Sequence, residues 1–321
     1  MTQLHRPEGL RLGFGTGALN GRGDRAAQVR LIHAALDAGI THFDTARLYG
    51  DGTAEQILGD ALNGRRSDVF LVSKAGIIPP INTTFRRAVN KGLTIGRKLP
   101  GGVGVLPKPR WNEPTFGQFD VAQLRASLEE SLSALGTDYL DLFLLHEVDA
   151  HHLADGQVLK ALEDWRREGL FCSFGIASTR EQTDRILDSY PDAFPVVQTS
   201  DSVFDAAPRP AGEETTLLMT HSWLGASLER FQRAFNAEPK FAEKASHCVY
   251  ADIRRPRRLA RCLLEYALHS NPDGQVLFTT SRPDRITQMV RTAERPRLTD
   301  AQFKALAKVA EQVAKMDLAP A

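Results

Sequence analysis

Short apolar runs alternate with amphipathic stretches along almost the whole chain. Eight of these runs, rich in Val, Leu, Ile and Phe, have the length of buried strands and lie at residues 10–14, 40–45, 69–74, 139–146, 169–178, 194–200, 215–221 and 275–280. Near-continuous apolar runs are typical of parallel strands that are covered on both faces. The pattern therefore predicts a parallel β-sheet of eight strands.

Helix signals fill most of the gaps between these runs. Asp24 is placed to cap one helix, and the pairs Thr53–Gln56 and Asp120–Gln123 have the spacing of capping boxes at the start of two others. Further helices are expected at about 157–168, 180–190, 258–270, 284–293 and 299–316. Strands that alternate with helices indicate repeated βαβ units.

Eight such units favour an α/β fold of the (β/α)₈ or TIM-barrel type, formed as a single domain over residues 1–321. An open, doubly wound sheet is the alternative. Against it, the first glycine-rich turn reads GFGTG at 13–17 and lacks the GxGxxG spacing that opens a helix in dinucleotide-binding sheets.

Two places break the regular alternation. Residues 77–120 contain six Gly and six Pro, so they are expected to form a long insertion, or flap, after the third strand. The gap between strands six and seven offers only residues 201–214, with two prolines, and predicts a shortened sixth helix.

Composition narrows the class of protein. The chain has 321 residues, 42% hydrophobic and 25% charged, with a net charge of +1, which gives no reason to expect nucleic acid or a membrane surface as a partner. No apolar leader or membrane-spanning run is visible, and a cytoplasmic location is expected. The three cysteines, Cys172, Cys248 and Cys262, show no metal-binding or paired spacing.

Polar residues stand where three successive strands end. Asp44, Lys74 and His146 close the second, third and fourth apolar runs, and Tyr49 follows five residues after Asp44. In a barrel these ends meet at one mouth, where catalytic groups are found. An ammonium near a phenol lowers the pKa of the phenol, so this set suits proton transfer to a carbonyl oxygen that becomes an alkoxide.

Each of these residues also has an ordinary structural explanation. Asp44 by itself could cap a turn, the Lys74 side chain could extend to solvent, and His146 could be a core-edge histidine. None of these readings explains why three successive strands end in polar residues, and we therefore favour catalysis. His151 and His152 are better explained as part of a solvated loop than as metal ligands, and no metal site is expected.

The segments FDTARLYG, LVSK and LFLLH together resemble those of the aldo-keto reductases, and the resemblance extends over nearly the whole chain. It implies a (β/α)₈ barrel that binds NADP(H) without a Rossmann motif and transfers hydride between nicotinamide and a carbonyl carbon. By this resemblance Tyr49 is the proton donor, Lys74 and Asp44 tune it, and His146 positions the carbonyl.

The same resemblance implies a set of cofactor-binding residues. They are Gly15, Thr16, Asp44, Ser178, Gln198, His221, Ser222, Leu224, Ser281, Arg282 and Arg285. The arginines favour a 2′-phosphate and hence NADP(H) over NAD(H). The chain departs from the family pattern at Thr179, where Asn is usual, at His221, where a larger aromatic ring is usual, and at Gln288–Met289, where Glu–Asn is usual.

The sequence thus predicts an NADP(H)-dependent enzyme that interconverts an aldehyde, ketone or sugar with an alcohol. A sugar 1-dehydrogenase of the same family is one alternative. The other is a cofactor-binding regulatory protein on the same scaffold, like the potassium-channel beta subunits.

Overall fold

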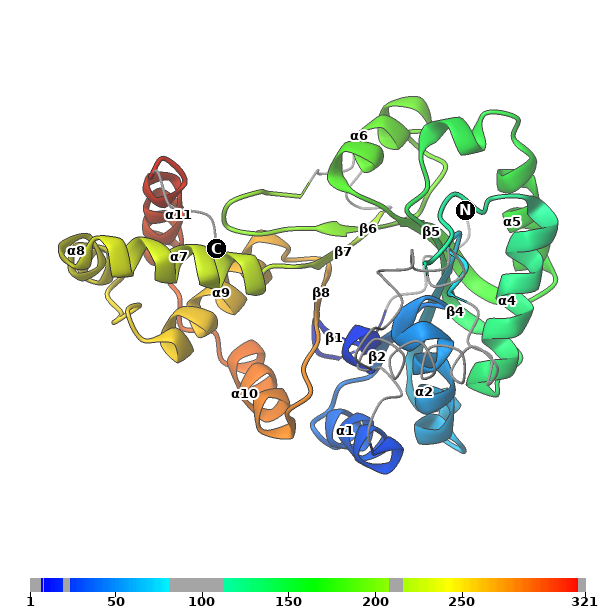
Figure 1. Cartoon of the computed structure of the whole chain (residues 1–321), viewed down its shortest axis with the longest axis horizontal. Helices are drawn as coiled ribbons and strands as arrows, with labels where there is room; N and C mark the ends of the chain where they lie inside the picture. The colour runs from blue at the N-terminus through cyan, green and yellow to red at the C-terminus, as the bar shows by residue number, and fades with distance from the viewer. Residues whose placement is uncertain (1–6, 8, 20–23, 81–112, 208–215, 317–321) are drawn as a thin grey trace, which may run out of the picture.

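Eight parallel strands close into a barrel in which each strand pairs with the next along the chain and β8 pairs with β1. The computed structural model describes residues 7, 9–19, 24–80, 113–207 and 216–316 (Figure 1). The strands are β1 Leu12–Gly15, β2 His42–Asp44, β3 Phe70–Ala75, β4 Leu140–His146, β5 Phe171–Ala177, β6 Val196–Ser200, β7 Leu217–His221 and β8 Gln275–Phe278. The predicted barrel is confirmed, and the doubly wound alternative is wrong.

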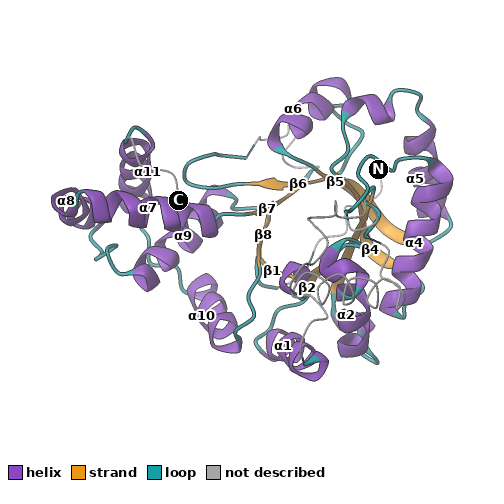
Figure 2. Cartoon of the chain, viewed as in Figure 1, coloured by secondary structure: helices purple, strands orange, loops and turns teal. Residues whose placement is uncertain are grey.

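Helices surround the barrel (Figure 2). They are α1 Arg25–Asp37, α2 Ala54–Leu62, α4 Val121–Leu135, α5 Gln157–Arg167, α6 Arg180–Ser189, α7 Gly225–Ala237, α8 Pro239–Val249, α9 Pro256–Ser270, α10 Pro283–Glu294 and α11 Asp300–Ala314. Asp24 caps α1 as predicted, because its carboxylate accepts a hydrogen bond from a backbone N–H group of the first turn. Asp120 caps α4 in the same way, but without the second hydrogen bond of the predicted capping box with Gln123.

The capping box expected at Thr53 does not form. Its hydroxyl donates instead to the carbonyl of Gly50 at 2.6 Å, within the tight turn that follows Tyr49. This turn has positive φ angles at three consecutive residues, from Gly50 to Gly52. The Thr53 hydroxyl therefore stabilises the turn after Tyr49 and is not available to cap α2.

Residues 222–257, in which the sequence pattern predicted no helix and which we therefore interpreted as a loop, contain α7 and α8. The buried residues Phe231, Ala234 and Phe235 have helical spacing in α7, and α8 begins with Pro239 at its first position. Figure 1 shows α7, α8, α9 and α11 grouped on one side of the barrel. A helical signal was present here, but the interpretation of the segment as a loop was wrong.

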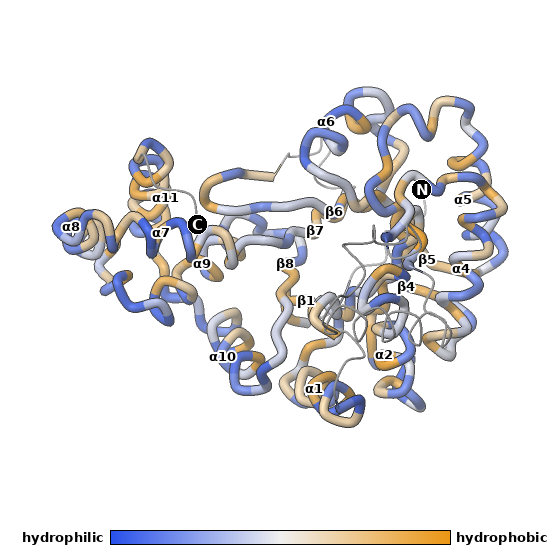
Figure 3. Tube along the Cα trace, in the orientation of Figure 1, coloured by the Kyte–Doolittle hydropathy of each residue, from blue (hydrophilic) through white to orange (hydrophobic). Residues whose placement is uncertain are grey.

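The core has two layers. Inside the barrel, one cluster of buried side chains includes Val72, Leu144, Met219 and Leu277. A larger cluster fills the space between the strands and the helices. Along the helices, hydrophilic and hydrophobic positions alternate in Figure 3, as expected for elements with one buried face. Two packed layers hold the strand ends in fixed positions relative to one another.

The two irregular segments keep their predicted places. Ile78 and Thr115 pair as an antiparallel bridge through two backbone hydrogen bonds, so the described ends of the 77–120 insertion lie together, while 81–112 lie outside the described residues. After β6, residues 201–207 form turns and no helix, as expected for a shortened sixth helix, and 208–215 lie outside the described part. Within the described ranges, no helix has the length and apolar character needed to cross a bilayer.

Candidate active site

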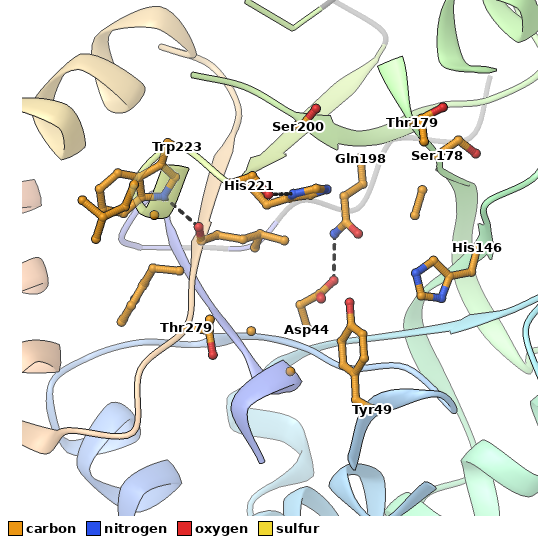
Figure 4. Close-up of a pocket in the computed structure, with 18 of the residues that line it drawn as sticks. Asp44, Tyr49, His146, Ser178, Thr179, Gln198, Ser200, His221, Trp223 and Thr279 are labelled. Atoms are coloured by element: carbon orange, nitrogen blue, oxygen red, sulfur yellow. Dashed lines mark hydrogen bonds between the residues drawn. The ribbon is translucent and has the colours of Figure 1, made fainter. Parts of the chain in front are cut away.

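The barrel brings the four predicted catalytic residues to one mouth. Asp44 and His146 are the last residues of β2 and β4, Lys74 is the next-to-last residue of β3, and Tyr49 begins the turn after β2. Asp44, Tyr49 and His146 line a cavity of about 640 Å³, a size typical of small-molecule sites. In Figure 4 their side chains surround the same space.

Lys74 lies beneath this cavity and is almost completely buried, with 1% of its surface exposed. Its ammonium donates three hydrogen bonds: to Asp44 Oδ1 at 2.5 Å, to the carbonyl of Thr45 at 2.9 Å and to the hydroxyl oxygen of Tyr49 at 3.3 Å. An ammonium has three N–H donors, so all of them have acceptors. The Tyr49 oxygen is thus an acceptor toward Lys74, which leaves its own O–H to donate elsewhere.

The electrostatics of this group correct one sequence-based expectation. Burial raises the pKa of Tyr49 above its ordinary value, and the neighbouring Lys74 ammonium only partly opposes that effect. Burial is the largest single influence on Lys74 and acts to lower its pKa, but the charge of Asp44 and the contacts with Tyr49 together outweigh burial and raise that pKa overall. In the protein without ligand, Tyr49 is therefore a neutral phenol and Lys74 a charged ammonium.

His146 is held as a neutral ring. Burial, followed by the charge of Lys74, lowers the pKa of His146 to about 3. Its ring meets the ring of Tyr49 edge to face, with centroids 6.1 Å apart. A neutral imidazole carries one N–H donor and one acceptor nitrogen. His146 can therefore orient an oxygen beside Tyr49 without competing with it as a proton donor.

A second buried network, which the sequence did not reveal, holds the segment between Asp44 and Tyr49. Arg47, in this segment, pairs with Glu55 at 3.5 Å and also with Glu130. Glu55 is fully buried in α2 and accepts a 2.6 Å hydrogen bond from the hydroxyl of Ser73, the neighbour of Lys74 in β3. The network links the backbone on both sides of the Tyr49–Lys74 contact.

Two of the predicted cofactor residues face the cavity with their acceptor atoms available. The Gln198 amide donates to Asp44 Oδ2 at 2.8 Å, and the Ser178 hydroxyl donates to the carbonyl of Val148 at 2.9 Å. Both side chains line the cavity, and the Gln198–Asp44 bond is visible in Figure 4. With the Ser178 hydroxyl donor and one N–H of Gln198 in use, the Gln198 carbonyl oxygen and the Ser178 oxygen can accept hydrogen bonds from an amide NH₂ group.

Of the other predicted cofactor residues, four line the cavity and one lies behind its wall. Gly15, His221, Ser222 and Leu224 line the cavity. Thr16 is buried outside the lining and donates to the hydroxyl of Thr45 at 2.8 Å. The structure therefore gives Thr16 a supporting position, because its hydroxyl is used to hold the segment that leads to Tyr49.

A smaller, second cavity of about 140 Å³ shares Leu224 with the first. Its wall carries four arginines, Arg257, Arg261, Arg282 and Arg285. Arg282 pairs with Asp284 at 2.8 Å and Arg261 with the buried Glu265 at 2.7 Å. Ser281 is exposed and is not part of this wall. Arg257 and Arg261, both on α9, were missed because the pattern of residues there predicts only an amphipathic helix.

The cavity also exposes residues that sequence reasoning did not select. Glu147, directly after His146, lines the wall, as do Ser200, Trp223 and Thr279. Trp223 donates to the carbonyl of Leu277 at 2.9 Å and so fixes the segment after β7 against β8. The position of Glu147 beside a strand-end histidine was the one signal that could have identified it.

His151 and His152 lie apart from this site. Their rings are in contact, with centroids 3.8 Å apart, and His152 also contacts Phe119. Within the ranges that the structure describes, no group of three or more His, Cys, Asp or Glu residues is arranged to hold a metal ion.

Comparison with known proteins yields matches of three kinds. A sequence model of the aldo/keto reductase family matches residues 11–215. An uncharacterized oxidoreductase, YqkF, of Bacillus subtilis is 24% identical over 91% of this chain and 90% of its own length. A D-threo-aldose 1-dehydrogenase from a Pseudomonas species is 35% identical, over 46% of this chain and 43% of its own. The crystal structure of an aldo/keto reductase from Klebsiella pneumoniae, in complex with NADP and acetate, has a TM-score of 0.61 at 19% identity and covers 97% of this chain and 93% of its own.

Proposed function

Since this chain belongs to the aldo/keto reductase family, we propose that it is an NADP(H)-dependent oxidoreductase that interconverts an aldehyde, ketone or sugar with the corresponding alcohol. The observation that carries the proposal is the contact of the buried Lys74 ammonium with the Tyr49 oxygen at 3.3 Å. It leaves a neutral phenol at the cavity wall with its proton free to be donated.

The residues then have distinct roles. A substrate carbonyl oxygen accepts hydrogen bonds from the Tyr49 O–H and from an N–H of the neutral His146. A bound NADP(H) would supply the hydride. As negative charge develops on the substrate oxygen, Tyr49 transfers its proton to it, and Lys74 stabilises the resulting phenolate. Asp44 keeps the Lys74 ammonium charged and in place throughout. Alcohol oxidation uses the same groups in reverse.

The residues of the two cavities fit such a cofactor. The acceptor oxygens of Gln198 and Ser178 suit the NH₂ of a nicotinamide carboxamide. His221 lines the same cavity, and burial lowers its pKa, so it offers a neutral ring for stacking. Leu224 joins this cavity to the arginine-rich one. Arg285, on that wall, suits a 2′-phosphate, and this supports NADP(H) over NAD(H).

A sugar dehydrogenase is the second candidate. The similarity to a D-threo-aldose 1-dehydrogenase supports it, as do the hydroxyl groups of Ser200 and Thr279 on the cavity wall. A purely regulatory, cofactor-binding role lacks such support, because the complete proton-transfer group would then serve no purpose.

The test is a titration of the purified protein with NADPH and with NADH, followed by a panel of aldehydes, ketones and aldoses in both directions. We expect tighter binding of NADPH and turnover with at least one aldehyde. Absence of turnover with every carbonyl and every aldose, despite NADPH binding, would overturn the enzymatic proposal in favour of the regulatory one.

A further inference from the structure

Glu147 carries the one formal charge on the wall of the active cavity that no neighbouring charge balances, among the residues that the structure describes. The cavity is lined by two carboxylates, those of Asp44 and Glu147. Asp44 is neutralised by Lys74 at 2.5 Å, whereas no ion pair joins Glu147 to a basic group in the described ranges. The cavity therefore carries a net negative charge beside the reacting groups.

The backbone at Glu147 has a conformation that side chains rarely adopt. Its φ angle is +57°, in the left-handed region, and its N–H donates to the carbonyl of Ala177 at 2.8 Å. Non-glycine residues in this region are uncommon, and they concentrate where a site requires a particular side chain. Ser222, on the opposite wall, shares this property with a φ of +63°. The fold thus holds Glu147 at the cavity wall in a backbone conformation that a glutamate does not favour by itself.

The charge of Glu147 reaches the catalytic group. Its carboxylate contributes to the raised pKa of Tyr49, after burial and the charge of Asp44. Among the residues that the structure describes, Lys74 is the one cation near this group, and its three donors are already used. His146 and His221 are neutral, because burial lowers both of their pKa values. In the described part of the site, nothing remains to attract a second negative charge.

We infer that Glu147 selects substrates by charge and hydroxyl content: the site takes neutral aldehydes with hydroxyl groups near the carbonyl, including open-chain aldoses, and rejects aldehydes that carry a carboxylate. This inference rests on the proposed function and narrows its substrate class. A carboxylate accepts hydrogen bonds from substrate hydroxyls, and it repels an anionic substrate more strongly in a cavity than in bulk water, because the protein wall lowers the effective dielectric. The hydroxyls of Ser200 and Thr279 complement a neutral polyol in the same way.

The experiment compares kcat/KM for propanal, glyceraldehyde, 4-oxobutanoate and the methyl ester of 4-oxobutanoate, with NADPH. For the native chain we expect the ester to exceed the acid by at least about tenfold, the effect of ~1.4 kcal/mol, and glyceraldehyde to exceed propanal. Glu147→Gln, which removes the charge and keeps the size, should bring the acid to within about threefold of the ester. Glu147→Ala should also abolish the preference for glyceraldehyde. Glu181→Gln, which removes a carboxylate from the exposed face of α6, is the matched control and should change neither ratio.

Equal reduction of the acid and the ester by the native chain would overturn the inference without any variant, so it does not depend on whether Glu147→Gln folds. An ester-to-acid ratio that stays unchanged in Glu147→Gln would also overturn it. Loss of propanal reduction in Glu147→Gln, with NADPH binding intact, would make Glu147 part of the reaction machinery and contradict a role in selection. Absence of turnover with all four compounds would instead count against the proposed function itself.

Discussion

The catalytic corner formed by β2, β3 and β4 differs sharply from the arginine-lined cavity between α9 and α10. In the corner, Asp44 and Lys74 are 3% and 1% exposed, and each hydrogen bond of the ammonium has a fixed acceptor. In the second cavity, Arg282 and Arg285 are exposed, and Arg282 already pairs with Asp284. Buried, mutually paired groups keep one geometry, whereas exposed charges are screened and can exchange partners. We therefore expect the corner to determine the rate of the chemistry and the second cavity to determine cofactor choice.

The largest effect is expected for Tyr49→Phe. It removes the donated proton but keeps the ring that packs beside His146, so kcat should fall by about 10³-fold or more. NADPH binding should change little, because the phenol acts on the substrate. Tyr139→Phe, far from the cavity, is the control. Fluorescence titration and steady-state kinetics check both expectations, and a large loss of NADPH affinity would contradict the role assigned to Tyr49.

Arg285→Ala tests the other side of the comparison. Loss of a charge-assisted hydrogen bond to a 2′-phosphate should weaken NADPH binding by about 10- to 100-fold and leave NADH binding nearly unchanged. kcat at saturating NADPH should stay close to that of the native chain. Arg291→Ala, on an exposed face of the same helix, is the matched control. Equal weakening of both cofactors would remove the structural reason for preferring NADP(H).

Glu55→Gln tests whether the buried network holds the catalytic corner. It removes the charge that pairs with Arg47, so the free energy of unfolding should fall by about 2 kcal/mol. kcat should fall by about tenfold with little change in KM, since misplacing Tyr49 affects the chemistry more than binding. Glu130→Gln removes the other partner of Arg47, which is 62% exposed, and its cost should stay below about 1 kcal/mol. If Glu55→Gln and Glu130→Gln reduced the free energy of unfolding and kcat equally, the buried position of Glu55 would not explain its effect.

The last prediction concerns the pH dependence of stability. His42 lies in the barrel interior, where burial lowers its pKa from 6.5 to about 4. The unfolded chain therefore binds more protons at His42 than the folded one between these values, and its contribution to stability, complete above pH 6.5, is lost as the pH falls toward 4. His42→Leu should reduce the slope of unfolding free energy with pH in this window, by at most about 1.4 kcal/mol per pH unit. Denaturant melts at several pH values measure it, and an unchanged slope would refute the assignment.

The sequence predicted correctly those features that depend on residues close together in the chain. The eight strands and the caps Asp24 and Asp120 follow from local patterns, and the structure agrees with them. The capping box at Thr53 failed because a neighbouring turn competed for the same hydroxyl. The helices in 222–257 were missed although Phe231 and Phe235, which are buried in α7, have helical spacing in the sequence.

The sequence by itself determined that Asp44, Tyr49, Lys74 and His146 meet, because consecutive parallel strands of a barrel end at one mouth. Only the tertiary structure decided what these groups are chemically. The net effect of burial on Tyr49, the pairing of Arg47 with Glu130 and the unbalanced charge of Glu147 all depend on neighbours that are distant in the chain. Desolvation and charge pairing act through space, so no pattern of spacing along the chain reveals them.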